Sequence, residues 1–183
     1  MPRDRFGAGE VLMRTLFAVV ATLALTTPAL AQQQRPNCEA WEYRAFDFWI
    51  GDWDAFRADT NAPAGHSSVR AEDTGCVITE HWTSIGQPYS GRSLNIYDRA
   101  TQKWEQFWVD STGNRVHFIG SPTPTGMRIA TETPVTVAPN QQAYSRITFT
   151  NNPDGTVLQH GEQSADGQAW TTSYAFIYRR RTE

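Results

Sequence analysis

The sequence predicts an all-β protein: a single antiparallel closed β-barrel of about ten strands, with a short N-terminal helical turn. From Trp53 onward, segments of about eight residues recur between turn signals, which is typical of an antiparallel sandwich or barrel. The connections supply Gly or Asx residues where a hairpin needs positive φ. A meander of many short strands removes its exposed edges most simply by closing on itself.

The elements follow from these signals. The helical turn is expected within residues 38–48, and the Pro- and Thr-rich stretch at 134–140 is expected to be a loop. Because tight turns connect the strands, neighbours in the sequence should be neighbours in the sheet. The turns are expected at residues 73–75, 110–114, 152–155 and 165–167. The strands are expected at residues 53–59, 67–73, 76–84, 91–98, 103–110, 115–121, 126–133, 143–151, 156–164 and 169–179.

The first 31 residues have the pattern of a signal peptide. Arg14 precedes the apolar run 16–25, and small residues precede Gln32, so cleavage is expected after Ala31. Met13 is a possible true start, since the residues before it dilute the positive charge. The apolar run is shorter than the roughly 20 residues that span a bilayer, so no membrane span is expected. Residues 32–183 should then form one β-barrel domain in the periplasm or outside the cell.

Two cysteines, Cys38 and Cys76, lie in the predicted mature chain. An oxidising compartment outside the cytoplasm favours their pairing, so a disulfide between them is predicted. Two thiols without nearby histidines do not make a four-ligand zinc set, so no metal site is expected. No dinucleotide fingerprint or phosphate-binding loop is present, and no cofactor is expected.

Composition points away from nucleic acid and toward a small-molecule ligand. Asp and Glu number 19 against 16 Lys and Arg, and the basic residues are spread along the chain, so no phosphate-binding surface is predicted. Seven Trp, six Tyr and nine Phe are many for 183 residues. Such side chains fill a core or line a pocket for a flat or apolar molecule. The sequence favours no particular oligomeric state.

The residues Gly51-Asp52-Trp53 are similar to the Gly-x-Trp motif that opens the first strand of lipocalin-like, or calycin, barrels. In such barrels an arginine from the last strand stacks on that tryptophan. The resemblance therefore implies that Arg179 or Arg180 stacks on Trp53, and that the pair closes one end of the barrel as a plug. The chain resembles an exported bacterial family of uncharacterised calycin-like barrels. The resemblance implies a fold and a compartment, and no shared activity. Its motifs are residues 46–54, 75–82, 91–98, 103–113, 146–170 and 178–181.

Several polar and aromatic residues on the predicted strands are candidates for a ligand site. Half of the strand positions in a closed barrel face inward, and buried polar groups need hydrogen-bond partners, ordered water or a ligand. Aromatic walls are expected from Trp82, Trp108, Trp170 and Tyr174. Polar groups that orient a ligand, or that could act as acid and base, are expected from Glu80, Asn95, Gln106, Asp110, Arg146 and Glu162.

Three functions remain open at this point. The first is an exported barrel that binds a small, apolar or aromatic molecule in its interior. The second is a cofactor-free lyase or isomerase in which a carboxylate or a histidine moves a proton, and it needs a strongly shifted pKa inside the cavity. The third is a structural or interaction protein of the cell envelope, which would expose a large apolar patch. Serine hydrolase chemistry has no support, because no Gly-x-Ser-x-Gly frame is present.

Overall fold

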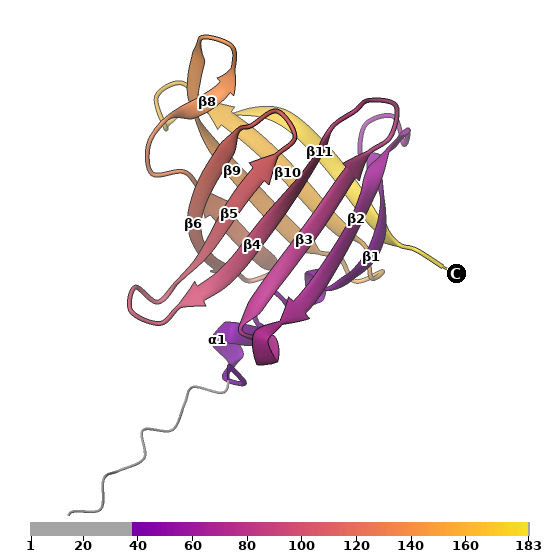
Figure 1. Ribbon diagram of the computed structural model, residues 1–183, viewed down its shortest axis with the longest axis vertical. Coiled ribbons are helices and arrows are strands. Elements are labelled where there is room, and N and C mark those ends of the chain that lie inside the picture. Colours follow the sequence, from indigo (N-terminus) through magenta and orange to yellow (C-terminus); the bar gives the residue numbers. More distant parts are fainter. Residues whose placement is uncertain (1–37, 183) are drawn as a thin grey trace, which may run out of the picture. The chain divides into compact units, whose positions relative to one another are not determined.

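A computed structural model of the chain describes residues 38–182. These residues form a closed ten-stranded antiparallel barrel with one extra strand and a short helical turn before the first strand (Figure 1). The predicted fold class is therefore confirmed. The predicted signal peptide and the alternative start at Met13 lie outside the described residues.

The strands alternate in direction around the barrel, and each is joined to the next by a short connection. The helical segments are α1 (Trp41–Arg44), η1 (Asp47–Trp49) and η2 (Asp73–Gly75). The strands are β1 (Gly51–Arg57), β2 (Pro63–Glu72), β3 (Val77–Ser84), β4 (Ser90–Asp98), β5 (Lys103–Asp110), β6 (Arg115–Thr123), β7 (Gly126–Ala130), β8 (Val135–Ala138), β9 (Gln141–Asn151), β10 (Val157–Ser164) and β11 (Thr171–Arg180).

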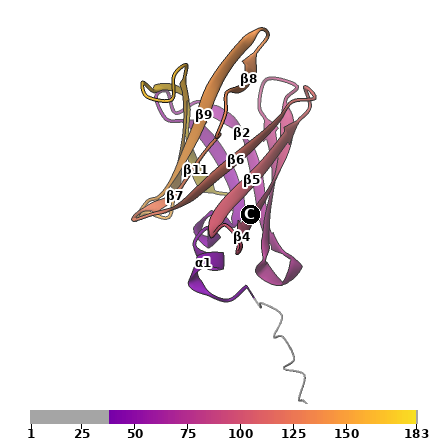
Figure 2. The ribbon, with the colours of Figure 1, turned by 90° about the vertical axis from the view of Figure 1, so that its left-hand side faces the viewer.

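The barrel closes through pairs that lie far apart in the sequence. Its order is β10-β11-β1-β2-β3-β4-β5-β6-β7-β9, and β9 also pairs with β10 to complete the ring. β8 stays outside the ring, because it pairs with β9 alone. Figures 1 and 2 show β8 and the adjoining part of β9 at the end of the barrel opposite α1.

The expected loop at 134–140 is wrong, because four of its residues form β8. A four-residue strand flanked by proline gives too short an alternation to be separated from a loop. Strand β2 also begins at Pro63, earlier than expected. Proline is tolerated as the first residue of a strand, and Gly65 leaves room for the Trp82 ring, which a Cβ there would overlap.

Aromatic rings fill the end of the barrel that carries α1. Phe46 stacks on Trp49 with 5.0 Å between ring centroids, and Phe149 meets both rings edge-on or tilted, at 4.9 Å and 4.8 Å. Trp104 completes the cluster and donates a hydrogen bond from Nε1 to the carbonyl oxygen of Glu42 at 3.0 Å. All four rings are 2% exposed or less. The helical turn therefore closes this end of the barrel.

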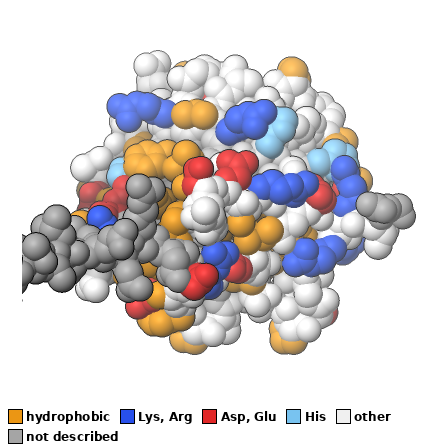
Figure 3. Space-filling view, turned by 60° about the horizontal axis from the view of Figure 1, so that its bottom comes forward, with side chains coloured by type: hydrophobic (Ala, Val, Ile, Leu, Met, Phe, Trp, Pro, Cys, Tyr) orange, Lys and Arg blue, Asp and Glu red, His pale blue; other side chains and the backbone are white. Residues whose placement is uncertain are grey.

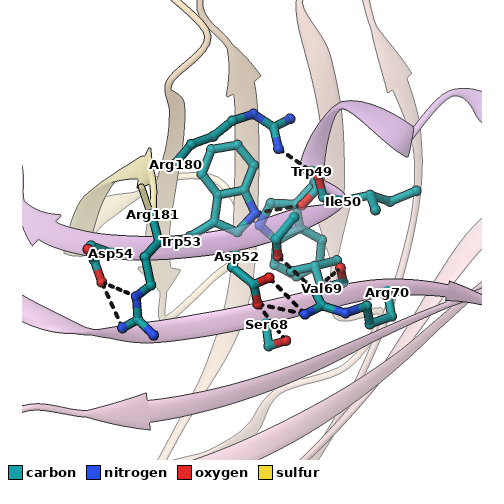
Figure 4. A network of polar contacts seen from close by, with 11 residues as sticks. Trp49, Ile50, Asp52, Trp53, Asp54, Ser68, Val69, Arg70, Arg180 and Arg181 are labelled. Atoms are coloured by element: carbon teal, nitrogen blue, oxygen red, sulfur yellow. Dashed lines mark hydrogen bonds and ion pairs between the residues drawn. The ribbon is translucent and has the colours of Figure 1, made fainter. Parts of the chain in front are cut away.

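Trp53 lies at the start of β1, beside this aromatic cluster (Figure 4). The guanidinium of Arg180 lies over its ring, with Cζ 4.5 Å from the ring centroid, and donates a hydrogen bond to the carbonyl oxygen of Ile50 at 3.2 Å. A Cβ on Gly51 would lie 2.5 Å from Arg180 Nη1, so a side chain there would displace the guanidinium from this position. The plug partner of Trp53 is Arg180, since Arg179 lies over the Phe56 ring instead.

Replacing Arg180 by glutamine should lower the free energy of unfolding by about 1 kcal/mol, because a cation over a partly desolvated indole contributes about that much. Urea unfolding followed by tryptophan fluorescence measures the change. Arg115→Gln is the matched control, because Arg115 is exposed and no side-chain contact is recorded for it within residues 38–182. Equal stability of the two variants would contradict a stabilising role for the Arg180–Trp53 stack.

The predicted disulfide between Cys38 and Cys76 is confirmed. It joins the segment before α1 to the residue that precedes β3. Arg44 reinforces the same junction, since its Nη1 donates to the carbonyl oxygen of Gly75 at 3.0 Å while Nη2 pairs with Asp47 at 2.6 Å. The closing turn is thus fixed to the barrel wall by one covalent and several polar contacts.

Charged side chains on the outer wall form local pairs. Asp52 pairs with Arg70 at 2.7 Å, and Asp54 pairs with Arg181 at 2.9 Å (Figure 4). On the face seen in Figure 3, Lys and Arg side chains are scattered among acidic and neutral ones rather than gathered in one patch. Within residues 38–182, no helix has the length and apolar character needed to cross a membrane.

Candidate functional site

A cavity of about 410 Å³ occupies the half of the barrel opposite α1. Its mouth is bordered by the end of β1, the β3–β4 and β5–β6 connections, and β8. The wall is built mainly by three strands, which each contribute three alternate residues. These are Glu80, Trp82 and Ser84 of β3, Gln106, Trp108 and Asp110 of β5, and Tyr174, Phe176 and Tyr178 of β11.

Six of the ten predicted ligand residues line this cavity. Successive side chains of a strand point to opposite faces, so one inward residue brings its second neighbours inward as well. The six are Glu80, Trp82, Gln106, Trp108, Asp110 and Tyr174. Asn95 also points inward, but it is fully buried and lies behind Gln106, from whose Nε2 it accepts a hydrogen bond of 2.7 Å.

Aromatic rings form one continuous wall of the cavity. Trp82 and Phe176 are stacked, with centroids 5.5 Å apart and planes 16° from parallel. Tyr174 is tilted against Phe176 at 5.1 Å, and Tyr178 against Trp82 at 6.1 Å. Such a surface suits the flat or apolar part of a ligand.

Glycines on the neighbouring strands make room for two cavity rings. A Cβ on Gly91 would overlap the ring of Trp108, and a Cβ on Gly161 would overlap the ring of Tyr174. Glycine inside a strand often marks such a close approach. A glycine on one strand together with a large aromatic residue on the adjacent strand is therefore a sequence signal that both positions face the barrel interior.

Glu80 lies inside the barrel and is only 4% exposed. Its Oε1 accepts a hydrogen bond from the Ser67 hydroxyl at 2.7 Å, and its Oε2 accepts one from the Ser93 hydroxyl at 3.4 Å. No Arg, Lys or His side chain of the described chain forms an ion pair with it. Burial without a counter-charge raises the pKa of Glu80 to about 7, although the two hydroxyl groups lower it in part.

The polar network continues from Glu80 along two strands. Asn95 donates from Nδ2 to Ser93 Oγ at 2.9 Å and to the carbonyl oxygen of Ile78 at 2.8 Å. With Gln106 and Ser67, these residues form a connected chain of hydrogen bonds around one carboxyl group. Such a chain holds the Glu80 side chain in one orientation, since each partner is itself fixed.

A second polar group stands nearer the mouth. Asp110 accepts hydrogen bonds from the Trp108 Nε1 and the Tyr89 hydroxyl, both at 3.3 Å, and from the Thr112 hydroxyl and backbone N–H. Burial opposes ionisation of Asp110, but the hydrogen bonds from Thr112 outweigh it and lower the pKa. Burial and the neighbouring Asp110 raise the pKa of Tyr89 to about 12. Asp110 is therefore the charged acid and Tyr89 the neutral phenol of this rim.

The other three predicted site residues lie away from the cavity. Arg146 and Glu162 face outward, because their neighbours Ser145 and Gln163 line the cavity on β9 and β10. They form a bidentate pair at 2.8 Å and 2.7 Å, and the Arg146 guanidinium lies 4.1 Å from the Trp170 ring centroid. Arg146, Glu162 and Trp170, which were expected in the ligand site, thus form a cluster on the outer wall instead.

Other residues that line the cavity or contact Glu80 were absent from the predicted site. Phe176 and Tyr178 share the alternating aromatic face of β11, so the period-two pattern points to them. Ser67 and Ser93 are 3% exposed, and small hydroxyl residues on strands carry no signal of that burial. Tyr89 and Arg57 reach the cavity from strand ends, where the face of a side chain depends on the bend of the connection.

The four histidines do not reach the cavity. His66 pairs with Asp54, His117 with Glu105 and His160 with Thr172, all on the outer wall, while His81 is exposed. Among residues 38–182, no group of three or more His, Cys, Asp or Glu side chains could hold a metal ion. Among the described residues that line the cavity, Glu80 has the side chain whose pKa, at about 7, suits proton exchange near neutral pH.

The site as a whole is an aromatic chamber, open at one end, with one buried carboxyl group at depth and a polar rim. It can hold an apolar ligand, and Glu80 or Gln106 can form a hydrogen bond with one polar group of that ligand. Comparison of the chain with protein-family models and with curated proteins found no match.

Proposed function

We propose that the protein binds a small, apolar or aromatic molecule inside its barrel. The observation that carries the proposal is the cavity of about 410 Å³ with the stacked rings of Trp82 and Phe176 on its wall. Ligand sites of proteins are mostly apolar clefts of about 300–1,000 Å³ with a few fixed polar groups. The chamber fits the lower part of that range, which suits a molecule of one or two rings.

Export belongs to the same proposal. The Cys38–Cys76 disulfide supports it, since such bonds persist in oxidising compartments. Membership of the exported family of calycin-like barrels also remains a proposal. The Arg180 stack over Trp53, opposite the open mouth, supports that family assignment, because it is the arrangement the family resemblance implies.

The binding proposal is tested by filling the cavity. Ser145 lines the chamber, and its hydroxyl makes no recorded hydrogen bond in the described chain, so Ser145→Phe should occupy the space with little loss of contacts. We expect this variant to weaken binding of the neutral fluorescent probe N-phenyl-1-naphthylamine by about tenfold or more. Fluorescence titration measures the Kd.

The matched control is Thr150→Phe, on the same strand but with its side chain directed outward. This variant adds the same ring to the outer wall and should leave the Kd of the probe unchanged. Binding that survives Ser145→Phe undiminished, in a variant whose circular dichroism matches that of the wild type, would place the probe outside the chamber and refute the proposal.

A second candidate function is a cofactor-free lyase or isomerase. One observation favours it: a carboxyl group in the cavity whose pKa is raised to about 7, a value suited to taking and returning a proton near neutral pH. Glu80 would carry the proton, because no histidine lines the cavity within the described residues. Solvent deuterium exchange at the α-carbon of acetophenone, followed by NMR, should then be faster with wild type than with Glu80→Gln. Equal rates exclude this role for that substrate class.

The third hypothesis, an envelope interaction protein, has a weaker basis in the structure. Large apolar side chains exposed on the barrel wall include Leu94, Phe107 and Val109, and Leu94 pairs with Phe107 across β4 and β5. Phe107 is also covered on one side by the His117 ring, at 4.4 Å between centroids. The chamber, in contrast, combines stacked rings with a buried carboxyl group, which favours the binding function.

A further inference from the structure

The buried end of the chamber is acidic without a matching cation. Glu80 has its two hydrogen bonds from Ser67 and Ser93, and a carboxylate offers about four acceptor positions, so some remain free toward the cavity it lines. Burying an unpaired carboxylate is costly, and proteins pair such groups with a cation or hydrogen-bond donors. Within residues 38–182, nothing positively charged is placed beside this one.

The surrounding rings have the same preference. Faces of Trp, Tyr and Phe carry negative potential and attract an ammonium or guanidinium group, more strongly where water is excluded. Trp82, Tyr174, Phe176 and Tyr178 all line the chamber that contains Glu80. Burial raises the pKa of the Tyr174 and Tyr178 hydroxyls, and the nearby negative charge of Glu80 raises it further.

The one basic side chain that lines the chamber in the described residues is Arg57, which is exposed at the mouth. Asp110 is charged and stands at the same rim. An anionic ligand would therefore find its partner at the entrance, whereas a cationic ligand finds one at depth. The deeper and drier group exerts the stronger electrostatic effect, because screening by water is weaker there.

We propose that the molecule bound in the barrel carries a protonated amine, which pairs with the Glu80 carboxylate while its apolar body lies against Trp82 and Phe176. This inference rests on the proposed binding function and names the chemical class of its ligand. The amine supplies the cation that residues 38–182 do not place beside Glu80. Ser67 and Ser93 act as positioning residues, because they hold the carboxylate and do not meet the amine, and Asn95 in turn holds Ser93.

The test compares three probes that share a phenyl ring and differ in their polar end: 2-phenylethylamine, 2-phenylethanol and 3-phenylpropanoate. Isothermal titration calorimetry at pH 8 measures each Kd. We expect the amine to bind about tenfold or more tightly than the alcohol, and the carboxylate to bind most weakly. Glu80→Gln should remove the preference for the amine and leave the Kd of the alcohol within about twofold.

Glu72→Gln is the matched control, since it removes one carboxylate from an exposed position at the closed end of the barrel. It should not change the Kd of any probe. Circular dichroism and unfolding curves establish that both variants fold. A further check is Arg57→Gln, which would weaken binding of 3-phenylpropanoate if the mouth selected the ligand.

The affinity for the amine should also depend on pH. Below a pKa of about 7 the Glu80 carboxyl holds its proton, so amine binding must displace it, and the Kd should rise by up to about tenfold per pH unit between pH 7 and 5.5. The other titratable groups lining the chamber do not change charge in this window. The pKa values of Tyr89, Tyr174 and Tyr178 are raised, and that of Asp110 is lowered.

The outcomes separate the two proposals. If the alcohol binds as tightly as the amine, and Glu80→Gln changes neither, the barrel is a site for neutral aromatic molecules and the amine inference is wrong. If the carboxylate binds best and Arg57→Gln weakens it, the site selects anions, which also overturns the inference. Both proposals would be overturned if none of the three probes bound and if Ser145→Phe kept the wild-type Kd for N-phenyl-1-naphthylamine.

Discussion

Trp53→Ala is expected to lower the free energy of unfolding by about 3–5 kcal/mol, the range measured for truncating a fully buried large aromatic residue. Trp53 is 1% exposed, and its Nε1 donates a hydrogen bond to the carbonyl oxygen of Trp49 at 2.9 Å. Its removal leaves a cavity at the closed end, and it also strips Arg180 of its ring partner. Urea or guanidinium unfolding followed by circular dichroism measures the loss.

Trp41→Ala is the matched control, because Trp41 lies in α1 at the same end of the barrel and is 69% exposed. It should change the free energy of unfolding by less than about 0.5 kcal/mol. Trp53 does not line the chamber, so the folded Trp53→Ala variant should retain the wild-type Kd for N-phenyl-1-naphthylamine. Unchanged stability in Trp53→Ala would contradict the assignment of this residue to the core of the closed end.

Turn chemistry in the sequence was sufficient to predict the barrel. Gly113, Gly155 and Gly167 all adopt positive φ in connections that were expected to be hairpins. Each such turn joins two strands that must lie side by side, so a long series of them leaves few alternatives to a meander. The largest misses are β8 and the early start of β2, where proline beside a short apolar run is ambiguous between loop and strand end.

The inward side of each strand was less predictable than its existence. On β3 and β5, tryptophan and carboxamide or carboxylate groups share one face, and that face is inward. On β9 and β10, Arg146 and Glu162 form an ion pair with each other on the outer wall. The charge of these residues therefore gave no information about which side of the strand faces the interior. Trp170 precedes Thr171, the first residue of β11, and a register shift lies between Gly161 and Glu162, so the alternation from Tyr174 does not extend to it.

The properties of Glu80 illustrate a limit of another kind. The sequence predicted that Glu80 lies on a strand. It could not predict that no cation lies beside it, because that depends on which side chains four separate strands bring together. A buried acid beside an arginine would have a lowered pKa, and the same acid between two serines has a raised one. The difference separates a structural ion pair from a group that can titrate.

Glu80→Gln should therefore make the stability of the fold less dependent on pH. The pKa of Glu80 is about 7 in the folded chain, against a reference value of 4.5. Because the folded state holds the proton more tightly, the contribution of this carboxyl is complete below pH 4.5 and is lost as the pH rises through 7. The gap corresponds to a loss on the order of 3 kcal/mol in the free energy of unfolding.

Glutamine at this position keeps the shape of the side chain and can accept a hydrogen bond from Ser67 while donating one to Ser93. The variant should match the wild type within about 1 kcal/mol at pH 5 and exceed it by on the order of 2–3 kcal/mol at pH 8. Urea unfolding at both pH values measures the difference, and comparing variants cancels every other titrating group. Glu72→Gln, which removes an exposed carboxyl, should follow the wild type at both values. If Glu80→Gln were instead less stable than the wild type at pH 8, the Glu80 carboxylate would have to be paired in the folded state. The unpaired buried carboxyl group, on which both the amine site and the proton-transfer candidate depend, would then not exist.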